Sequence, residues 1–349
     1  MRIAQIAPLI EAVPPRLYGG TERIVSYLTE ELVAQGHDVT LFASGDSQTS
    51  AKLVPMVPSA LRLDPSVKDQ MAPTLLMLEH VFSQAHKFDV LHFHLDYFPF
   101  SLFSRQNVPF VTTLHGRLDL DELSPVYDAF GHVPVVSISD SQREPLPQAN
   151  FVSTIYHGLP SQLLTPVRAK HDYLAFLGRI CPEKRVDRAI EIARRAGLPI
   201  KIAAKIDRVD QEYFDTQIKH LMDQPHVEFI GEINEQQKRE FLGGAMGLLM
   251  PIDWPEPFGL VMIEAMACGT PVIAYRHGSV PEVVEDGKTG FVVRNIDEAV
   301  AAARRLPLLP RAAIRARFEE RFSATRMAKD YVSVYEQAIA AMRMPIPAE

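Results

Sequence analysis

Two glutamates eight residues apart, Glu256 and Glu264, are the chemical groups that stand out in this sequence. Glu256 lies in the segment Pro-Glu-Pro-Phe-Gly (255–259), where two prolines and a glycine prevent a continuous helix. Glu264 belongs to the apolar run Leu260–Ala267, which has the length of a short helix. A helix start offers free N–H groups and a positive dipole end that suit a phosphate. We therefore expect a ligand that carries both phosphates and hydroxyls, such as a nucleotide sugar.

A pair of cations, Arg179 and Lys184, follows the expected strand Tyr173–Gly178. A guanidinium and an ammonium in one strand-to-helix loop can clamp a pyrophosphate, and they can stabilise charge on a departing nucleotide diphosphate without a metal. Because cations at a helix start oppose the dipole, their placement favours anion binding. Lys205 ends the next expected strand and adds positive charge to the same edge.

The first half of the chain contributes weaker signals. Gly19 and Gly20 open an expected helix and would let the backbone approach a ligand closely, although a tight turn explains them nearly as well. No G-x-G-x-x-G fingerprint accompanies them. His115 ends an expected strand, where its imidazole could hydrogen-bond a sugar hydroxyl or a reacting oxygen. In the second half, main-chain groups of Gly231 and Ile233 at a turn could meet a nucleobase edge.

Metal and cofactor signals are poor. His92, His94 and Asp96 alternate along one strand, but no further ligand motif accompanies them, so a polar strand end is the favoured interpretation. We expect no metal and no cofactor. Cys181 and Cys268 are far apart and fit a reducing compartment better than a disulfide scaffold. The single tryptophan is interpreted as a packing residue.

Strand-length apolar runs alternate with helical patterns, which is typical of parallel α/β architecture. Strands are expected at 3–8, 38–43, 90–93, 109–114, 133–137, 151–155, 173–178, 200–204, 227–230, 247–250, 272–274 and 290–292. Helices are expected at 21–35, 74–86, 186–196, 210–222, 234–243, 260–267, 296–306 and, as one helical tail, about 311–342.

The pattern restarts after the turn-rich segment 158–161, so we predict two doubly wound parallel-sheet halves, residues 1–158 and 159–324, with a ligand cleft between them. The chain has 349 residues and no apolar run long enough to span a membrane. Residues 1–158 hold 17 Asp and Glu against 10 Lys and Arg, which disfavours nucleic acid and stable association with anionic lipid. The N-terminus is interpreted as a strand and not as a signal peptide, which favours a cytoplasmic protein.

These motifs together resemble the family 4 (group 1) retaining glycosyltransferases, which use nucleotide sugars and have the two-domain GT-B fold. The resemblance rests on Tyr18-Gly19-Gly20-Thr21-Glu22, His115-Gly116, Gly178-Arg179 with Glu183-Lys184, and above all Glu256-x7-Glu264. Gly278 with Pro281-Glu282-Val283, and Gly287-x-x-Gly290, extend it to nearly the whole chain.

What the resemblance implies is specific. The first domain would recognise the acceptor, the second would hold the donor, and a last helix at about 325–345 would pack on the first domain. Arg179 and Lys184 would bind the diphosphate, Glu256 the donor sugar near its reacting carbon, and Glu264 the ribose. Phe258, Gly259 and Leu260 would offer backbone N–H groups, Gly20 would approach the diphosphate, and His115 would touch the sugar.

The sequence departs from the family pattern in two places. Arg185 stands where Gly often follows the lysine of the clamp, and His157-Gly158-Leu159-Pro160 replaces a commoner Asn-Gly-Val-Asp. The first adds a cation or tilts the helix, and the second leaves the acceptor-side contacts open.

We therefore expect retaining transfer of a hexose-type sugar from a nucleotide diphosphate to a hydroxyl acceptor. A UDP-sugar is favoured, and a GDP- or ADP-sugar is possible. The alternatives are a sugar-nucleotide epimerase or phosphorylase on the same fold, and a non-catalytic two-lobed sugar-binding protein. Acceptor, linkage and oligomeric state do not follow from the sequence.

Overall fold

The computed structural model describes residues 1–16 and 19–343, and for Leu63 and Arg343 only the backbone. Contacts within the chain separate two compact units. Unit 1 comprises Met1–Gly158 together with the chain from Ala324, and unit 2 is Leu159–Ser323. No helix of the described part is long and apolar enough to cross a membrane.

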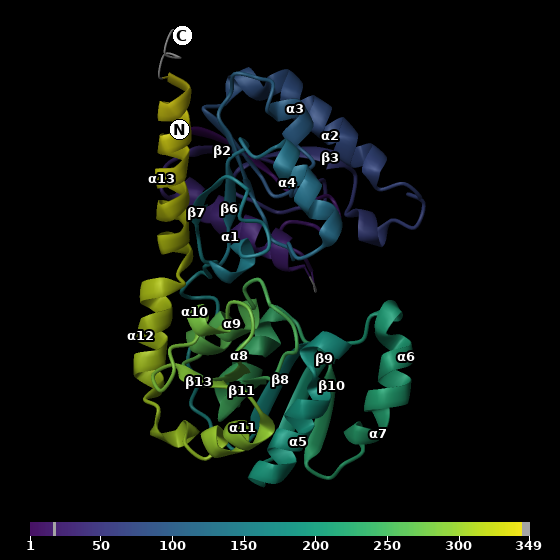
Figure 1. Ribbon diagram of the computed structural model, residues 1–349, viewed down its shortest axis with the longest axis vertical. Coiled ribbons are helices and arrows are strands. Elements are labelled where there is room, and N and C mark those ends of the chain that lie inside the picture. Colours follow the sequence, from purple (N-terminus) through teal and green to yellow (C-terminus); the bar gives the residue numbers. More distant parts are fainter. Residues whose placement is uncertain (17–18, 344–349) are drawn as a thin grey trace. The chain divides into compact units, whose positions relative to one another are not determined.

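Unit 1 is built on a parallel sheet of seven strands in the order β3-β2-β1-β4-β5-β6-β7 (Figure 1). Every neighbouring pair of strands is parallel. The strands are β1 (Arg2–Ile6), β2 (Asp38–Ser44), β3 (Lys52–Val57), β4 (Val90–Phe93), β5 (Phe110–Thr113), β6 (Val135–Ser137) and β7 (Phe151–Thr154).

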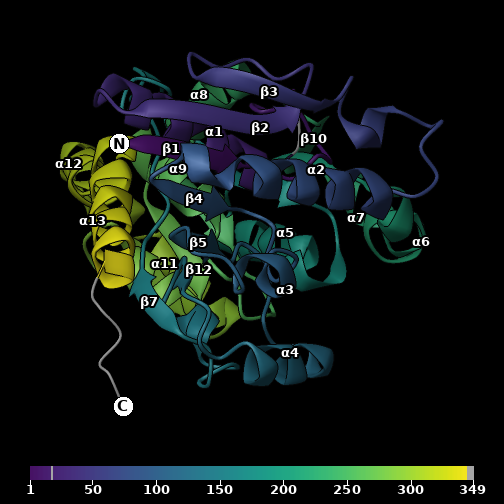
Figure 2. The same cartoon turned by 90° about the horizontal axis from the view of Figure 1, so that it is seen from above.

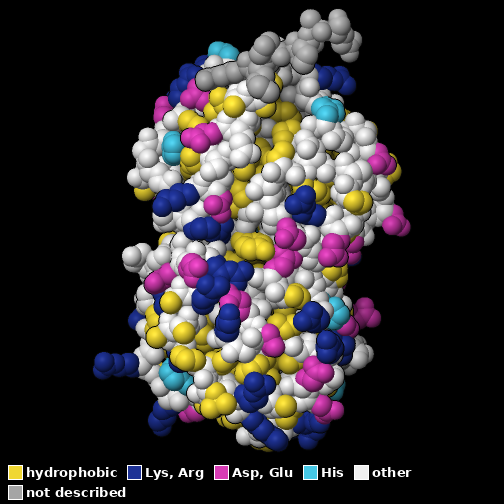
Figure 3. All heavy atoms as spheres, turned by 60° about the vertical axis from the view of Figure 1, so that its left-hand side comes forward, with side chains coloured by type: hydrophobic (Ala, Val, Ile, Leu, Met, Phe, Trp, Pro, Cys, Tyr) yellow, Lys and Arg dark blue, Asp and Glu magenta, His cyan; other side chains and the backbone are white. Residues whose placement is uncertain are grey.

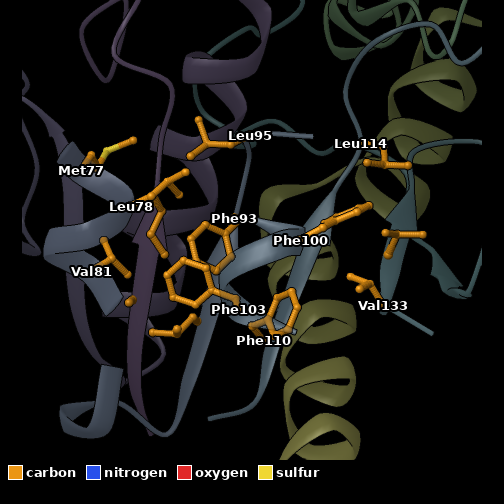
Figure 4. Close-up of a cluster of buried hydrophobic side chains, with 14 of the residues drawn as sticks. Met77, Leu78, Val81, Phe93, Leu95, Phe100, Phe103, Phe110, Leu114 and Val133 are labelled. Carbon is orange, nitrogen blue, oxygen red and sulfur yellow. The ribbon is translucent and has the colours of Figure 1, made fainter. Parts of the chain in front are cut away.

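Alternating side chains direct the two faces of this sheet to different helices. Leu91 and Phe93 face the main apolar cluster, which α2 (Met71–Gln84), α3 (Phe100–Phe103) and α4 (Ser124–Ala129) complete. Figure 4 shows Phe93 and Phe103 of this cluster packed together, with ring centroids 4.5 Å apart. His92, between the two, faces the opposite side and contacts α13 (Ala324–Arg343).

The helices α1 (Gly20–Ala34) and α13 contact each other, and α13 also contacts β4 and β5. In Figure 2, α13 (yellow) lies beside the strands of unit 1, away from α2, α3 and α4. The C-terminal helix therefore belongs to unit 1, although it follows unit 2 in the sequence.

Unit 2 repeats the plan with six parallel strands in the order β10-β9-β8-β11-β12-β13. The strands are β8 (Leu174–Arg179), β9 (Ile200–Lys205), β10 (Val227–Gly231), β11 (Gly247–Met250), β12 (Val272–Tyr275) and β13 (Gly290–Val293). In both sheets the strand order reverses beside the first strand of the unit, at β1/β4 and at β8/β11. Doubly wound sheets bind ligands at such points, beyond the carboxyl ends of the strands.

The helices of unit 2 pack in two groups. α5 (Val186–Ala196) contacts α11 (Ile296–Ala303), and α9 (Leu260–Ala267) contacts α8 (Glu235–Gly244) and α12 (Arg311–Arg321). Unit 2 also contains α6 (Gln211–Tyr213), a π-helical turn (Phe214–Ile218), α7 (Lys219–Met222), α10 (Val280–Val283) and three short 3-10 helices, Pro182–Lys184, Arg208–Asp210 and Leu306–Leu308. Figure 3 shows one face of the molecule, on which Lys and Arg side chains lie beside Asp and Glu side chains.

The predicted fold class, two Rossmann-like parallel sheets, is confirmed, and all twelve expected strands are present. β3 was not predicted, because Pro55 interrupts its apolar run; in the structure β3 is an edge strand, where a missing N–H is tolerated. The prediction of one helical tail is wrong. The helix breaks at Phe322 and Ser323, and the two pieces belong to different units.

Candidate active site

The chemically distinctive residues of unit 2 gather beyond the carboxyl ends of β8, β11 and β12. The loop after β8 carries Lys184, the loop after β11 carries Glu256, and the loop after β12 carries Gly278. β8 and β11 are the neighbours at which the strand order reverses. Side chains from distant parts of the sequence therefore meet at the position where a doubly wound sheet binds its ligand.

Lys184 and Glu256 form an ion pair across 72 residues of sequence. The Lys184 ammonium donates to Oε2 of Glu256, and the Trp254 indole N–H donates to the same oxygen at 3.0 Å. The ammonium also lies 5.3 Å from the centroid of the Trp254 ring. Glu256 thus has one oxygen held by two donors of the protein, and its side chain is 12% exposed.

Backbone contacts fix the Glu256 segment. Gly278 has φ 53° and lies so close that a Cβ on it would be 2.3 Å from the carbonyl oxygen of Glu256, so no larger residue fits. The Ser279 N–H donates to the same carbonyl at 3.0 Å, and its hydroxyl donates to the carbonyl of Phe258 at 2.7 Å. The loop after β12 therefore binds the loop after β11 at two points, the carbonyls of Glu256 and Phe258.

The start of α9 is a partly exposed helix N-terminus. Gly259 is its N-cap with φ 77°, a conformation that favours glycine, and no side chain of the described part of the chain caps the helix. Phe258 is buried, whereas Gly259 and Leu260 are partly exposed. A helix start of this kind suits an anion, and the binding of one by the N–H groups of Phe258, Gly259 and Leu260 stays a prediction.

Glu264 lies in the second turn of α9 and is almost fully buried, with its side chain 6% exposed. Its Oε1 accepts a hydrogen bond of 2.6 Å from Lys238 of α8. The two predicted acids therefore have different cationic partners, Lys184 for Glu256 and Lys238 for Glu264. Lys238 was not predicted, because its partner lies 26 residues away and no local pattern marks it.

Arg179 and Lys205 lie side by side as paired residues of β8 and β9. Both contact Asp207, Lys205 at 2.8 Å and Arg179 at 3.7 Å, and Arg179 also lies 3.4 Å from Asp210. The two cations are brought together as the sequence predicted, but two aspartates that were not predicted partly neutralise them. A phosphate would have to compete with these carboxylates for Arg179.

Arg185, the residue that departs from the family pattern, has a backbone conformation that explains the usual glycine. Its φ is 52°, in the left-handed region, and it is the N-cap of α5. Its guanidinium contacts Asp187 at 2.8 Å and Asp253 at 2.9 Å, and Arg188 reaches the same Asp253 oxygen at 3.1 Å. The Asp253 N–H donates to the carbonyl of Glu183, so these contacts join the loop of Lys184 to the loop of Glu256.

In unit 1, Gly19 is the N-cap of α1 with φ 150°, and a Cβ there would be 2.8 Å from Pro15. Gly20 is the first residue of the helix. The backbone at the start of α1 therefore bears no side chain at these two positions. Tyr18, which precedes them in the motif, lies outside the described residues.

His115 follows β5 and ends a buried chain of hydrogen bonds. Its Nε2 is 2.9 Å from Nδ1 of His94, whose Nε2 is 2.8 Å from Oε1 of Gln5. The Gln5 amide donates to Tyr335 of α13 at 3.0 Å. Burial lowers the pKa of His115 to about 3, so the imidazole is neutral. Its Nδ1 is buried without a hydrogen-bond partner within residues 1–16 and 19–343, and the ring stacks on His157 with centroids 5.3 Å apart.

The polar strand end considered as a metal site is accounted for by protein contacts. His92 contacts Tyr335 and Thr113, both at 2.7 Å, and Asp96 accepts a hydrogen bond from the backbone of His115. Burial raises the pKa of Asp96 to about 6. Within residues 1–16 and 19–343, no group of three or more His, Cys, Asp and Glu is arranged to hold a metal ion.

Gly231 and Ile233 follow β10 at the edge of the unit 2 sheet. Gly231 has φ 83° and lies at a register shift between β10 and β9. Both residues are partly exposed, so their backbone groups are accessible to a ligand. No contact joins them to Lys184 or Glu256 among the described residues.

The fold and this site define a two-domain glycosyltransferase, and comparison with known proteins identifies the family. The family described as Glycosyltransferase Family 4 matches residues 18–144, and the family described as Glycosyl transferases group 1 matches residues 165–321. The chain therefore belongs to the group 1, family 4 glycosyltransferases, and the predicted family membership is confirmed.

Individual relatives are similar to this chain over nearly its whole length. Phosphatidyl-myo-inositol mannosyltransferase of Mycobacterium leprae (strain TN) is 26% identical over 371 residues, which cover 96% of each sequence. AviGT4, a glycosyltransferase involved in avilamycin A biosynthesis, has a TM-score of 0.75 at 22% identity and covers 97% of this chain and 98% of its own. Anabaena HepE in complex with UDP and glucose has a TM-score of 0.74 at 17% identity and covers 97% of this chain and 100% of its own. The structural likenesses identify the fold as GT-B.

Proposed function

We propose that the protein is a retaining glycosyltransferase that moves a hexose-type sugar from a nucleotide diphosphate to a hydroxyl acceptor. The observation that carries the proposal is the contact of Lys184 with Glu256 at the point where the strand order of unit 2 reverses. One group suits a diphosphate and the other suits sugar hydroxyls. Their loops are fixed by Gly278 and Asp253, so the pair is built into the fold.

In the proposed reaction the bond between the sugar C1 and the diphosphate oxygen breaks, and a bond from C1 to the acceptor oxygen forms on the same face. The acceptor proton passes to the leaving phosphate. Lys184, Arg179 and the first N–H groups of α9 would stabilise the charge that develops on the diphosphate. Glu256 would orient the sugar through its hydroxyls, which favours reaction by positioning.

Other residues would bind the rest of the donor. Glu264 would accept hydrogen bonds from the ribose, and Lys205, Gly231 and Ile233 lie on the sheet edge where the base would be held. Unit 1 would contribute the backbone at Gly19 and Gly20, and His115 as a neutral imidazole that contacts the sugar. These assignments give each predicted residue one role in binding or in leaving-group departure.

The base of the donor is proposed to be uracil, since HepE, which shares the fold, was solved with UDP. Titration calorimetry with UDP, GDP and ADP tests this choice directly. We expect UDP to bind at least 10-fold more tightly than GDP and ADP, and tighter binding of GDP or ADP would contradict the choice of uracil. Release of nucleotide diphosphate from the matching sugar should then depend on an added acceptor, which distinguishes transfer from epimerisation. An enzyme to which none of the three nucleotides binds would contradict the proposal.

Replacement of Lys184 or Glu256 by alanine tests the site itself. Each change should lower turnover about 10²–10³-fold, the usual effect of removing one group that stabilises a transition state. Lys219→Ala is the matched control, because Lys219 is 67% exposed on α7 and forms an ion pair with the exposed Asp215. Circular dichroism should show an unchanged fold in all three variants. Near-normal turnover in both site variants would reject the assignment.

A further inference from the structure

Trp254, which was interpreted from the sequence as a packing residue, contacts both members of the ion pair between Lys184 and Glu256. Its indole N–H donates to Oε2 of Glu256 at 3.0 Å, and its ring lies 5.3 Å from the Lys184 ammonium. The other carboxylate oxygen of Glu256, Oε1, accepts no hydrogen bond from the part of the chain that the structure describes. One oxygen is therefore held by the protein, and the other is available to a ligand.

The position of Trp254 is itself fixed. The preceding residue, Asp253, donates its N–H to the Glu183 carbonyl at 2.9 Å and accepts hydrogen bonds from Arg185 and Arg188. The following turn is closed by the Glu256 N–H, which donates to the Trp254 carbonyl at 2.9 Å. The main chain that carries the indole is thus anchored on both sides, and the indole is a neutral group that can only donate.

The two donors on Oε2 differ in how they respond to a diphosphate. The Lys184 ammonium is a compact charge on a flexible stem, and a diphosphate carries more negative charge than one carboxylate. When Lys184 moves to the diphosphate, Oε2 loses its charged partner. The anchored indole N–H stays, and it keeps the Glu256 carboxylate in the orientation that directs Oε1 at the sugar.

We propose that Trp254 is a positioning residue that holds Glu256 while Lys184 transfers from Glu256 to the diphosphate of the donor. This inference rests on the proposed function, because it needs a ligand that competes for Lys184. It assigns the tryptophan a role in turnover and none in nucleotide affinity. It also predicts a spectroscopic change, since the cation leaves the ring face when the diphosphate binds.

The single tryptophan of the chain makes this change measurable, because intrinsic fluorescence reports Trp254 alone. Titration of the whole protein with inorganic pyrophosphate, which has no base to stack, should change the emission and reach saturation. The Lys184→Met variant lacks the cation that moves, so its emission should stay constant under the same titration. Equal changes of emission in both proteins would overturn the proposal that Lys184 leaves Glu256 for the diphosphate.

The Trp254→Phe variant tests the positioning role, since phenylalanine keeps a ring for Lys184 but has no N–H. We expect turnover to fall 10- to 100-fold, while the Kd for UDP, GDP or ADP stays within threefold of the parent and the melting temperature is unchanged. Wild-type turnover, or a loss of affinity that equals the loss of turnover, would overturn the proposal. Absence of nucleotide binding to the parent enzyme would instead reject the proposed function, and this inference with it.

Discussion

The contact between Glu264 and Lys238 places a carboxylate where water hardly reaches. The Lys238 ammonium is 2.6 Å from Oε1, and the two side chains are 6% and 15% exposed. Removal of one partner from such a pair leaves an uncompensated buried charge, which costs about 3–5 kcal/mol. We therefore expect Lys238→Met to destabilise unit 2 by about 3 kcal/mol. The double variant Lys238→Met, Glu264→Gln should recover much of that loss. Urea unfolding followed by Trp254 fluorescence measures both, because Trp254 lies in unit 2.

An exposed pair on the same unit provides the comparison. Lys219 and Asp215 are 67% and 47% exposed and 3.6 Å apart, so Lys219→Met should cost less than about 1 kcal/mol. If Lys238→Met lowers the free energy of unfolding by no more than this control does, the buried pair does not stabilise unit 2 as described. Glu264 would then serve ligand binding and not the stability of unit 2.

A side chain of the site could be predicted only where the neighbouring sequence marks it. Glu256 and Glu264 stand in one segment whose prolines, glycine and apolar helix mark them. Trp254 is two residues from Glu256, but its role depends on Lys184, which is 72 residues from Glu256 in sequence. The contact of Asp207 with Arg179 of β8 and the contact of Lys238 with Glu264 of α9 likewise join different elements. Such contacts arise only when the sheet brings several loop ends together, so sequence patterns could not show them.

The start of α5 combines strain and stabilisation in one residue. Arg185 has φ 52°, which costs a residue with a Cβ about 1 kcal/mol relative to glycine, and its guanidinium contacts Asp187 and Asp253. Arg185→Ala keeps the strain and loses the ion pairs, whereas Arg185→Gly loses both. We therefore expect the glycine variant to be about 1 kcal/mol more stable than the alanine variant in urea unfolding. Equal stabilities would show that the left-handed conformation is not populated.

The strands and helices themselves followed closely from sequence period and length. Apolar runs of strand length located twelve of the thirteen strands, and the bounds of α5 and α9 were predicted as observed. The errors have physical causes. Pro55 interrupts the apolar run of the edge strand β3, so this strand was not predicted. The break at Phe322 separates α12 from α13, but no proline or glycine marks it in the sequence. Because the helix breaks there, α13 can pack on the face of the unit 1 sheet that carries buried polar side chains. Tertiary contacts determine this packing, and local helix propensity does not.

The two units differ in how many buried histidines they contain, so acid should affect them unequally. In unit 1, burial lowers the pKa of His92, His94, His115 and His157 below the usual 6.5. Each stays neutral in the folded state but binds a proton in the unfolded state below about pH 6.5. Stability is therefore lost as pH falls, by up to about 1.4 kcal/mol per pH unit for each histidine. Asp96 and Glu22, whose pKa values are raised by burial, act in the opposite direction and offset part of this loss.

Unit 2 has no matching set: among its described histidines a lowered pKa is found for His171 alone. Urea unfolding at pH 7 and pH 5 separates the units, since Trp254 emission follows unit 2 and hydrogen exchange of α13 follows unit 1. We expect the unit 1 transition to move to lower urea at pH 5 by clearly more than the Trp254 transition. Equal shifts of both transitions would mean that the histidine chain from Gln5 to His115 is not closed to protons in the folded protein. The neutral state of His115 on which the proposed sugar contact depends would then be lost below pH 6.5.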